Sequence, residues 1–291
     1  MSRTLSIVLI MAVYALCYVG IKVALPHAPP LFFGGIRILI GGLALLTALV
    51  VSQTSIWPAK GNWGWVVGLA LLATFGGTAT MFIAAKEASA GIASVLGNLQ
   101  PILTLALALM FLGEKATWSK LTALVLGTVG IVLISVPSLA AGGFGEAKGA
   151  VLALASSLIV AVTNVAVKRI AGEELLRIIT WQLLFGSVPL LVASAATESW
   201  TAIHINGVFV TAALLLGVLG TAFVNYAWYK IVQREDVGRV GMFFFLVPVI
   251  GLLSGVLLFG EKITPVQAGG IVVTVGSLAF LRNRPSKEAS S

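Results

Sequence analysis

The sequence predicts an all-α polytopic membrane protein with ten transmembrane helices, arranged as two inverted five-helix repeats around a central cavity. Of the 291 residues, 59% are hydrophobic and 10% are charged, with a mean hydropathy of +1.07, whereas a soluble domain is about one quarter charged. The charges cluster and leave apolar stretches of about 20 residues, each long enough to cross a hydrocarbon core. One phrase occurs twice in the chain, which indicates a duplicated unit.

The apolar stretches define the expected helices. They cover residues 5–25, 30–52, 63–85, 91–112, 117–137, 149–168, 175–196, 207–229, 238–259 and 264–281. Helices are expected because an open sheet would leave backbone groups unpaired in lipid, and barrel strands would alternate polar with apolar residues. The first stretch follows Arg3 as a signal peptide would. It is too long for one and has no convincing small-residue cleavage site, so we expect it to be retained.

The repeated phrase is a proline, an apolar run and Gly-Glu-Lys. It runs from Pro101 to Gly113-Glu114-Lys115 and again from Pro248 to Gly260-Glu261-Lys262, at a constant offset of 147 residues. Paired repeats are how many transporters are built, and an odd number of helices per copy requires the second copy to be inverted. We expect a first repeat at 1–137, a Gly-rich connection at 138–148, a second repeat at 149–281 and a polar tail at 282–291.

The basic excess, a net charge of +8, is distributed unevenly. With ten spans both termini face the same side, and most Lys and Arg residues fall on that side. This bias satisfies the positive-inside rule with both termini in the cytoplasm. The charge therefore does not call for nucleic acid as a partner. The single Cys17 lies within a span and cannot form an internal disulfide.

On these features the chain resembles the drug/metabolite transporter superfamily, EamA type. The resemblance rests on the doubled five-span unit, on Arg37 in the second span, and on the phrases that begin at Pro101 and Pro248. Within that superfamily the chain is most similar to the YddG-type bacterial exporters of aromatic amino acids. The resemblance implies a central cavity lined by the first, third, fourth, sixth, eighth and ninth spans.

Polar and aromatic side chains deep within the first and fourth spans are the first candidates for substrate binding. Tyr14, Tyr18 and Lys22 recur every four residues and share one face of the first helix. An interfacial position of the tyrosines and a snorkelling lysine is the alternative. Asn98 and Gln100 lie within the fourth span, where an unpaired amide costs several kcal/mol, so both are expected to face neighbours or water.

Pro101 and Pro248 are the candidate hinges. Pro101 removes one backbone donor and frees a carbonyl about four residues earlier, near Gly97. A broken turn there suits a polar ligand, and a structural kink packed by glycine is the alternative. At the corresponding positions the ninth span has three phenylalanines, 243–245, of which we select Phe244 as a substrate-binding candidate.

The other candidates lie in the third, sixth and eighth spans. They are Thr78, Met81, Phe82, Thr163, Asn164, Asn225 and Tyr226. Trp228 and Tyr229, close to the expected end of the eighth span, are interpreted instead as an interfacial aromatic belt. Arg37 is the only clearly intramembrane charge. It could bind a substrate carboxylate, but snorkelling or a fixed structural bond is favoured.

Acidic residues and histidines lie only at span ends or in loops. No carboxylate inside the membrane can therefore bind proton and substrate in turn, as a proton-coupled antiporter requires. Glu114 and Glu261 are expected on opposite membrane faces, each capping the helix that follows it. No P-loop, nucleophile motif, metal-ligand cluster or dinucleotide fingerprint occurs, so we expect no catalytic residue, no metal and no cofactor.

The predicted function is export of small metabolites, above all aromatic or large neutral amino acids, by alternating access and facilitative uniport. The expected partners are a small-molecule substrate and the lipid bilayer. A drug or other metabolite exporter, and a non-transporting scaffold or enzyme, are the alternatives. The oligomeric state stays open, because the glycine-rich faces at Gly130, Gly269, Gly270 and Gly276 could pack within a monomer or between monomers.

Overall fold

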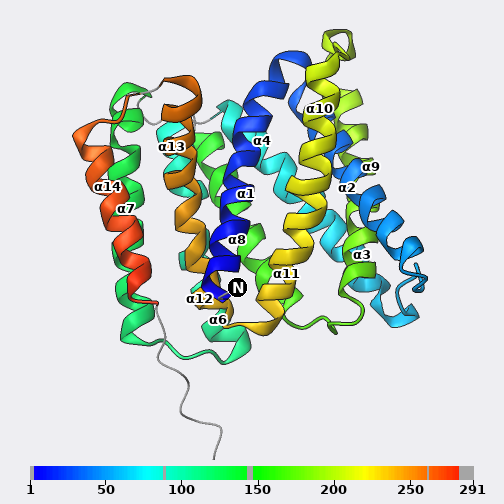
Figure 1. Cartoon of the computed structure of the whole chain (residues 1–291), viewed down its shortest axis with the longest axis horizontal. Coiled ribbons are helices and arrows are strands. Elements are labelled where there is room, and N and C mark those ends of the chain that lie inside the picture. The colour runs from blue at the N-terminus through cyan, green and yellow to red at the C-terminus, as the bar shows by residue number, and fades with distance from the viewer. Residues whose placement is uncertain (1–2, 88–89, 143–146, 261, 282–291) are drawn as a thin grey trace, which may run out of the picture.

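The computed structural model describes residues 3–87, 90–142, 147–260 and 262–281. Every regular element in these ranges is a helix, and the helices stand side by side in a bundle (Figure 1). Nine of the described helical stretches are long and apolar enough to cross a membrane, and the shorter apolar helix α14 (Pro265–Ala279) is the tenth. The predicted all-α membrane fold is confirmed. The tail, Glu261 and residues 143–146 lie outside the described residues.

Several of the spans are built from more than one helical segment. The first repeat contains α1 (Arg3–Ala24), α2 (Pro30–Val51), a third span of α3 (Trp63–Leu69), η3 (Ala70–Gly76) and α4 (Gly77–Glu87), a fourth of α5 (Ala90–Gly97) and α6 (Gln100–Leu112), and α7 (Trp118–Gly142). The second contains α8 (Ala147–Val167), α9 (Leu175–Thr197), an eighth span of α10 (Gly207–Leu215), η5 (Leu216–Phe223) and α11 (Val224–Arg234), a ninth of α12 (Val237–Gly241), η6 (Met242–Phe245) and α13 (Leu246–Phe259), and α14. Helix α7 runs on past Pro137, beyond its predicted end.

The backbone repeats as the sequence does. The third and eighth spans each contain a π-helical segment, η3 and η5, at matching places. Gly113 and Gly260 end the fourth and ninth spans with the same left-handed φ of 67°. This conformation is nearly free of strain only for glycine, which explains the glycine in both copies of the phrase.

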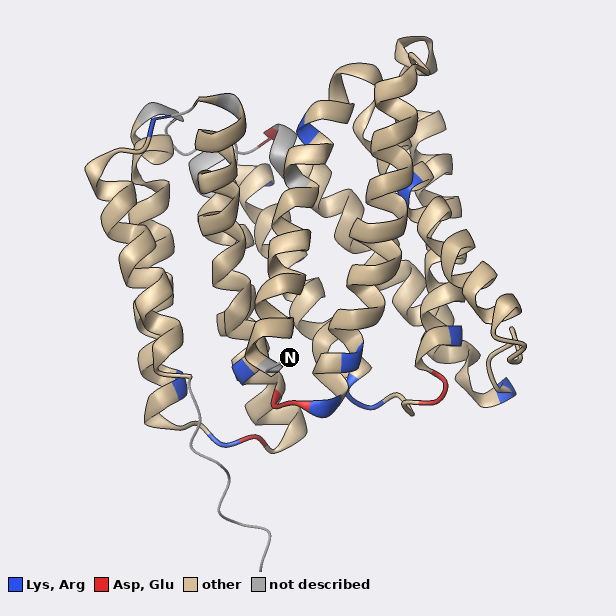
Figure 2. Ribbon diagram, in the orientation of Figure 1, with Lys and Arg blue, Asp and Glu red and all other residues tan. Residues whose placement is uncertain are grey.

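Helix α1 begins and α14 ends at the same end of the bundle, which we call the near end; the other is the far end (Figure 1). Most of the Lys and Arg residues coloured in Figure 2 lie at or close to the near end. This is the asymmetry from which the sequence predicts a cytoplasmic near end.

The fifth and tenth spans, α7 and α14, pack closely on each other within the chain. A methyl group added at Gly130 would lie 2.1 Å from Oγ1 of Thr274 and 2.9 Å from the carbonyl oxygen of Gly270. A methyl group at Gly269 or Gly276 would meet nothing within 4 Å. Of the two alternatives for the glycine faces, packing inside the monomer therefore applies to Gly130 and Gly270, where small residues let two backbones approach.

Candidate functional site

A cavity of about 490 Å³ lies between the two repeats. It is lined from the first, third, fourth, sixth, eighth and ninth spans, as the family resemblance implies, and also from α2 and α9. Its lining reaches Ile21 and Ala84, each about one turn from the far-end terminus of its helix. The cavity thus extends from the middle of the bundle toward the far end.

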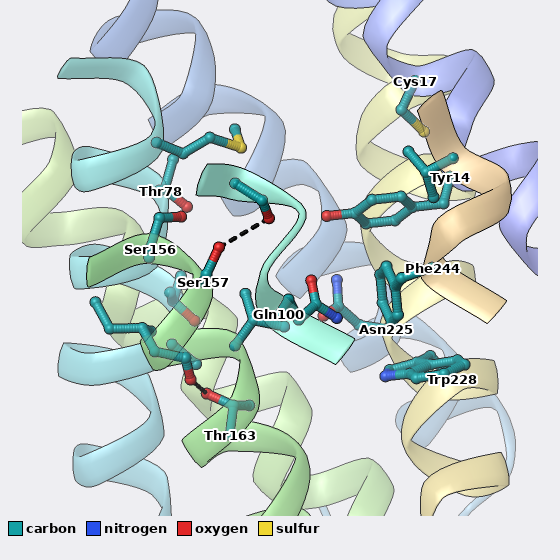
Figure 3. A pocket seen from close by; sticks show the side chains of 18 of the residues that line it. Tyr14, Cys17, Thr78, Gln100, Ser156, Ser157, Thr163, Asn225, Trp228 and Phe244 are labelled. Atoms are coloured by element: carbon teal, nitrogen blue, oxygen red, sulfur yellow. Dashed lines mark hydrogen bonds between the residues drawn. The ribbon is translucent and has the colours of Figure 1, made fainter. Parts of the chain in front are cut away.

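One wall of the cavity is aromatic. Phe244 of η6 lies between Tyr14 of α1 and Trp228 of α11, with ring centroids 5.5 Å and 4.7 Å apart and nearly perpendicular ring planes (Figure 3). Edge-to-face contact of this kind is a preferred geometry for aromatic pairs. The indole Nε1 of Trp228 donates to Oδ1 of Asn164 on α8 at 3.0 Å. An indole nitrogen can only donate, so this bond also orients the Asn164 amide.

The opposite wall carries hydroxyl groups. Figure 3 shows Thr78, Ser156, Ser157 and Thr163 facing the aromatic wall across the cavity. Two of these hydroxyls bond the backbone: Thr163 donates to the carbonyl of Ile159 at 2.8 Å, and Ser157 donates across to α5. The wall therefore combines hydroxyl oxygens that can accept hydrogen bonds with a scaffold that holds them in place.

The break in the fourth span is stabilised from the hydroxyl wall. Helix α5 ends at Gly97 and α6 begins at Gln100, which agrees with the effect expected of Pro101. The Ser157 hydroxyl donates to the carbonyls of Leu96 and Gly97, at 2.7 and 2.8 Å. The carbonyl freed by the proline is thus satisfied by a neighbouring helix, and the break is part of the packed structure.

Amide groups lie between the two walls. The side-chain nitrogens of Asn98 and Asn225 donate to carbonyls one turn back in their own spans, at 2.6 and 2.8 Å. Each of these two amides still has its oxygen and a second N–H for other partners. Gln182 of α9 donates to Oγ1 of Thr74 at 3.1 Å and to the Tyr229 hydroxyl at 3.4 Å.

Four cavity-lining side chains have a buried polar atom without a hydrogen-bond partner among the described residues. These atoms are Nε of Arg37, Nε2 of Gln100, Nδ2 of Asn164 and Oε1 of Gln182. A polar group removed from water without a partner costs free energy. A polar ligand or water in the cavity could pair with these atoms if the side chains turned toward it, because all four residues line the cavity.

The sequence-predicted site residues are mostly brought together. Those lining the cavity are Tyr14, Thr78, Met81, Asn98, Gln100, Thr163, Asn164, Asn225, Phe244 and Pro248. Phe82 does not line it: its ring packs at the position where Gly34 would carry a methyl group, 3.0 Å away. Pro101 also does not line it, and the side chain of Tyr18 lies outside the described part of the chain.

Tyr226 points elsewhere. Its hydroxyl accepts from Nζ of Lys230 at 2.9 Å, and its ring lines a groove between α1 and α11. Adjacent helix residues differ by about 100° in direction, so Tyr226 cannot share the cavity-facing direction of Asn225. Its selection as a substrate-binding residue is not supported by this position.

Sequence reasoning misplaced two aromatic residues. Trp228 and Tyr229 are each 5% exposed and line the cavity, so their interpretation as an interfacial belt was wrong. The eighth span continues to Arg234, which places both residues well inside the helix instead of at its end. Gln182 and Arg37 also line the cavity. A prediction that ended the eighth span at Arg234 would have placed Trp228 and Tyr229 inside the span and made them candidates for the cavity.

Toward the near end the cavity gives way to buried apolar packing, and an ion-pair cluster joins the two repeats there. Val167, Val232 and Val240, which lie beyond the aromatic wall toward this end, are at most 1% exposed. Nζ of Lys120 lies 3.2 Å from Glu114 and 2.6 Å from Asp236, so it joins the two repeats. We call these three charged residues the near-end cluster.

Glu114 caps a different helix from the one expected. Its carboxylate accepts from the backbone nitrogens of Val237 and Gly238, at the start of α12, and not from the start of α7. Burial raises the pKa of Glu114, and the adjacent Asp236 raises it further. Burial also acts to raise the pKa of Asp236, but hydrogen bonds from Glu114 and Lys120 outweigh burial and leave that pKa lowered.

Glu174 is a second near-end carboxylate with a perturbed pKa. It precedes α9 and accepts from the backbone nitrogen of Ala59 at 2.9 Å and from Asn62 at 3.4 Å. The backbone hydrogen bond is the main cause that lowers the pKa of Glu174, against the opposing effect of burial. Arg177 is also paired with this carboxylate. Glu174 therefore fixes the loop after α2.

Two repeats of membrane helices around a central cavity are the arrangement of many membrane transporters. Residues 2–136 and 147–283 match the EamA-like transporter family, so the chain belongs to that family and is a multi-pass membrane protein. It is 30% identical over 276 residues to the uncharacterized transporter YvbV of Bacillus subtilis, covering 93% of this chain and 88% of that protein.

Two further similarities extend this assignment. The chain is 29% identical over 280 residues to a probable amino-acid metabolite efflux pump of Salmonella typhimurium, covering 93% of this chain and 91% of that protein. A solved crystal structure that is 21% identical shares the fold with a TM-score of 0.82, covering 96% of this chain and 94% of that one. These similarities do not separate YddG-type exporters from other members, so that closer resemblance stays a prediction.

Proposed function

We propose that this transporter exports aromatic or large neutral amino acids, or metabolites closely similar to them, across the bacterial inner membrane. The observation that carries the proposal is the division of the cavity into an aromatic wall and a facing wall of hydroxyls. A small amphiphilic substrate needs both. The name of the Salmonella typhimurium relative, a probable amino-acid metabolite efflux pump, supports the same substrate class.

The aromatic wall suits a ring or a large apolar side chain. Tyr14, Phe244 and Trp228 form a continuous surface in which each contact is edge to face. An aromatic pair of this geometry contributes about 0.5–1.5 kcal/mol beyond the area it buries. The substrate's polar end would then meet the hydroxyls and amides on the other side, including Asn98 and Asn225.

The proposed mechanism is alternating access. In the proposed cycle this is the state closed at the near end, where Val167, Val232 and Val240 are buried and the near-end cluster joins the two repeats. The cavity reaches toward the far end. Pro101 and Pro248, at matched breaks in the fourth and ninth spans, are the proposed bending points. Among the described residues, no Asp, Glu or His lines the cavity, which supports facilitative uniport over proton antiport.

The proposal is tested by counterflow of labelled phenylalanine and tryptophan in proteoliposomes that contain only this protein. We expect saturable movement that an imposed pH gradient does not change. Stoichiometric proton movement with the substrate would overturn uniport. If no amino acid moves, the substrate class is wrong and a screen of drugs and other metabolites follows. A protein that moves none of these would instead have a non-transporting role.

A useful matched pair of variants is Phe244→Leu and Trp118→Leu. Phe244 lies at the centre of the aromatic wall, whereas Trp118 is 84% exposed at the start of α7. The first variant should raise the KM for phenylalanine several-fold, because one aromatic partner is lost from each of two pairs. The second should leave transport unchanged. If both variants change the KM for phenylalanine equally, the aromatic wall is not part of the binding site.

A further inference from the structure

The cavity has a single formal charge among its described lining residues, and that charge is the guanidinium of Arg37. Arg37 lies in the far-end third of α2 and is half-buried. The sequence favoured snorkelling or a fixed structural bond for this residue. Its Nε is buried and has no hydrogen-bond partner among the described residues, so this atom forms no fixed structural bond to them.

Among the described residues that line the cavity with Arg37, none is an aspartate or glutamate. The carboxylates of Glu87, Glu114, Glu174 and Asp236 pair with other cations: Lys120 with Glu114 and Asp236, Lys148 with Glu87, and Arg177 with Glu174. A cation without a counter-charge is costly within a membrane-spanning segment. Water or a ligand in the cavity must therefore supply the acceptor.

We propose that Arg37 binds an anionic group of the transported molecule, so that the cavity accepts carboxylate-bearing metabolites and rejects amines that lack one. This inference deepens the proposed function and rests on it for the identity of the site. A planar guanidinium matches a carboxylate through two parallel hydrogen bonds, and such charge-assisted bonds are stronger than neutral ones. The guanidinium has five N–H donors for such bonds, and no described residue accepts from its Nε.

Contacts along η5 relate Arg37 to the aromatic wall. A methyl group at Gly217 would lie 3.0 Å from the Arg37 carbonyl oxygen, and one at Gly220 would lie 2.4 Å from Sγ of Cys17. Both α1 and α2 thus pack against the same short stretch of η5. Cys17 is one helical turn from Tyr14, about 4.5 Å of rise. Arg37, Cys17 and Tyr14 line the same cavity, so a substrate with its carboxylate at Arg37 shares that cavity with the aromatic wall.

The test measures binding to the purified full-length chain by thermal stabilisation, with three probes that differ in charge. Phenylalanine carries both an amine and a carboxylate, 3-phenylpropionate carries only the carboxylate, and phenethylamine carries only the amine. We expect the first two to stabilise the wild-type protein and phenethylamine to have no effect. Arg37→Gln should weaken 3-phenylpropionate binding about tenfold or more, because a charged bidentate contact is lost.

Arg37→Lys and Arg234→Gln complete the design. The lysine keeps the positive charge but lacks the planar guanidinium, so Arg37→Lys should restore part of the affinity for 3-phenylpropionate. It is also the control in which the charge inside the membrane is retained. Arg234 is an exposed cation outside the cavity, so Arg234→Gln should leave the binding of all three probes unchanged. A purely structural role of Arg37 would lower thermal stability without changing the order in which the probes bind.

The outcomes separate this inference from the proposed function. Wild-type affinity of Arg37→Gln for 3-phenylpropionate would overturn the inference, as would the absence of stabilisation by either carboxylate probe. Arg37-dependent binding of 3-phenylpropionate, in a protein that moves no amino acid in proteoliposomes, would uphold the anion site and reject the amino-acid substrate. Amino-acid flux that Arg37→Gln does not change would uphold the amino-acid substrate and reject the anion site at Arg37.

Discussion

The two repeats have the same backbone features but different side chains at their ends. In both, a glycine with φ of 67° ends a broken span and a threonine begins the next helix. Thr264 forms a capping box with Gln267 at the start of α14. At the matching place in the first repeat Thr117 accepts from the backbone nitrogen of Lys120, and the Lys120 side chain joins the near-end cluster.

This difference shows how one duplicated frame closes a cavity asymmetrically. The backbone geometry depends on glycine, proline and capping residues, which both copies retain. The cross-repeat contacts depend on single side chains: Gln267 completes a local cap in the second repeat, whereas Lys120 at the matching position forms ion pairs with Glu114 and Asp236. The following predictions test whether the two copies differ in this way.

Removal of the Lys120 charge should have the largest effect. Lys120→Met leaves Glu114 and Asp236 without their shared cation, and breaking a buried ion pair on one side costs about 3 kcal/mol or more. We expect a cost close to about 3 kcal/mol, because the Asp236 side chain is 36% exposed and its charge is partly solvated. Unfolding of the purified protein in detergent, followed by tryptophan fluorescence, measures the loss.

Gln267→Met is the matched variant in the second repeat. It removes the side-chain half of the capping box, the bond from the Thr264 backbone nitrogen, which is worth at most about 1 kcal/mol, and leaves the near-end cluster intact. The two variants should therefore differ by about 2 kcal/mol in the free energy of unfolding. If they are equally destabilised, the comparison between the two ends of the repeats is wrong.

The pairing of the last helix of each repeat gives the next largest effect. Gly130→Ala would place a methyl group against the α14 backbone, and overpacking of this kind costs about 1–3 kcal/mol. Gly276→Ala meets nothing within 4 Å and should be neutral or slightly stabilising, because alanine favours helix. Thermal unfolding of the two variants checks the prediction, which fails if Gly130→Ala is as stable as the wild type.

A smaller effect is expected from Trp228→Phe. The variant keeps an aromatic ring but removes the hydrogen bond to Asn164, leaving a buried oxygen unpaired at a cost of about 1–3 kcal/mol. Part of that cost is recovered if water enters the cavity. We expect an increase in the KM for tryptophan in proteoliposomes together with a modest loss of stability. Trp118→Phe, at an exposed position, is the control.

The smallest predicted effect is a pH dependence at Glu174. Its pKa is lowered in the folded protein from an ordinary value of 4.5, so its contribution to stability is present above that pH and is lost as pH falls through the lowered value. The difference in melting temperature between the wild type and Glu174→Gln should therefore shrink as pH falls below about 4.5. The exposed neighbour Glu173, replaced by glutamine, should show no such trend.

Much of this protein is readable from its sequence because lipid imposes simple rules. Hydrophobic length determines the spans, an odd number of spans per copy determines inversion, and Pro101 with Gly113 determines where the fourth span breaks and ends. The left-handed conformation at Gly113 and Gly260 and the break before Gln100 follow from local chemistry. These features need no knowledge of neighbouring helices.

Only the tertiary structure decided which side chains face the cavity. A helix in lipid is apolar on its lipid-facing and its packed sides alike, so periodicity does not reveal which face turns inward. Phe82 and Tyr226 turn away from the cavity, whereas Trp228, Gln182 and Arg37 line it. The π-helical segments η3 and η5 also rotate the residues that follow them. Which side chains face the cavity is determined by contacts between spans that lie far apart in the chain, and the sequence of a single span does not specify those contacts.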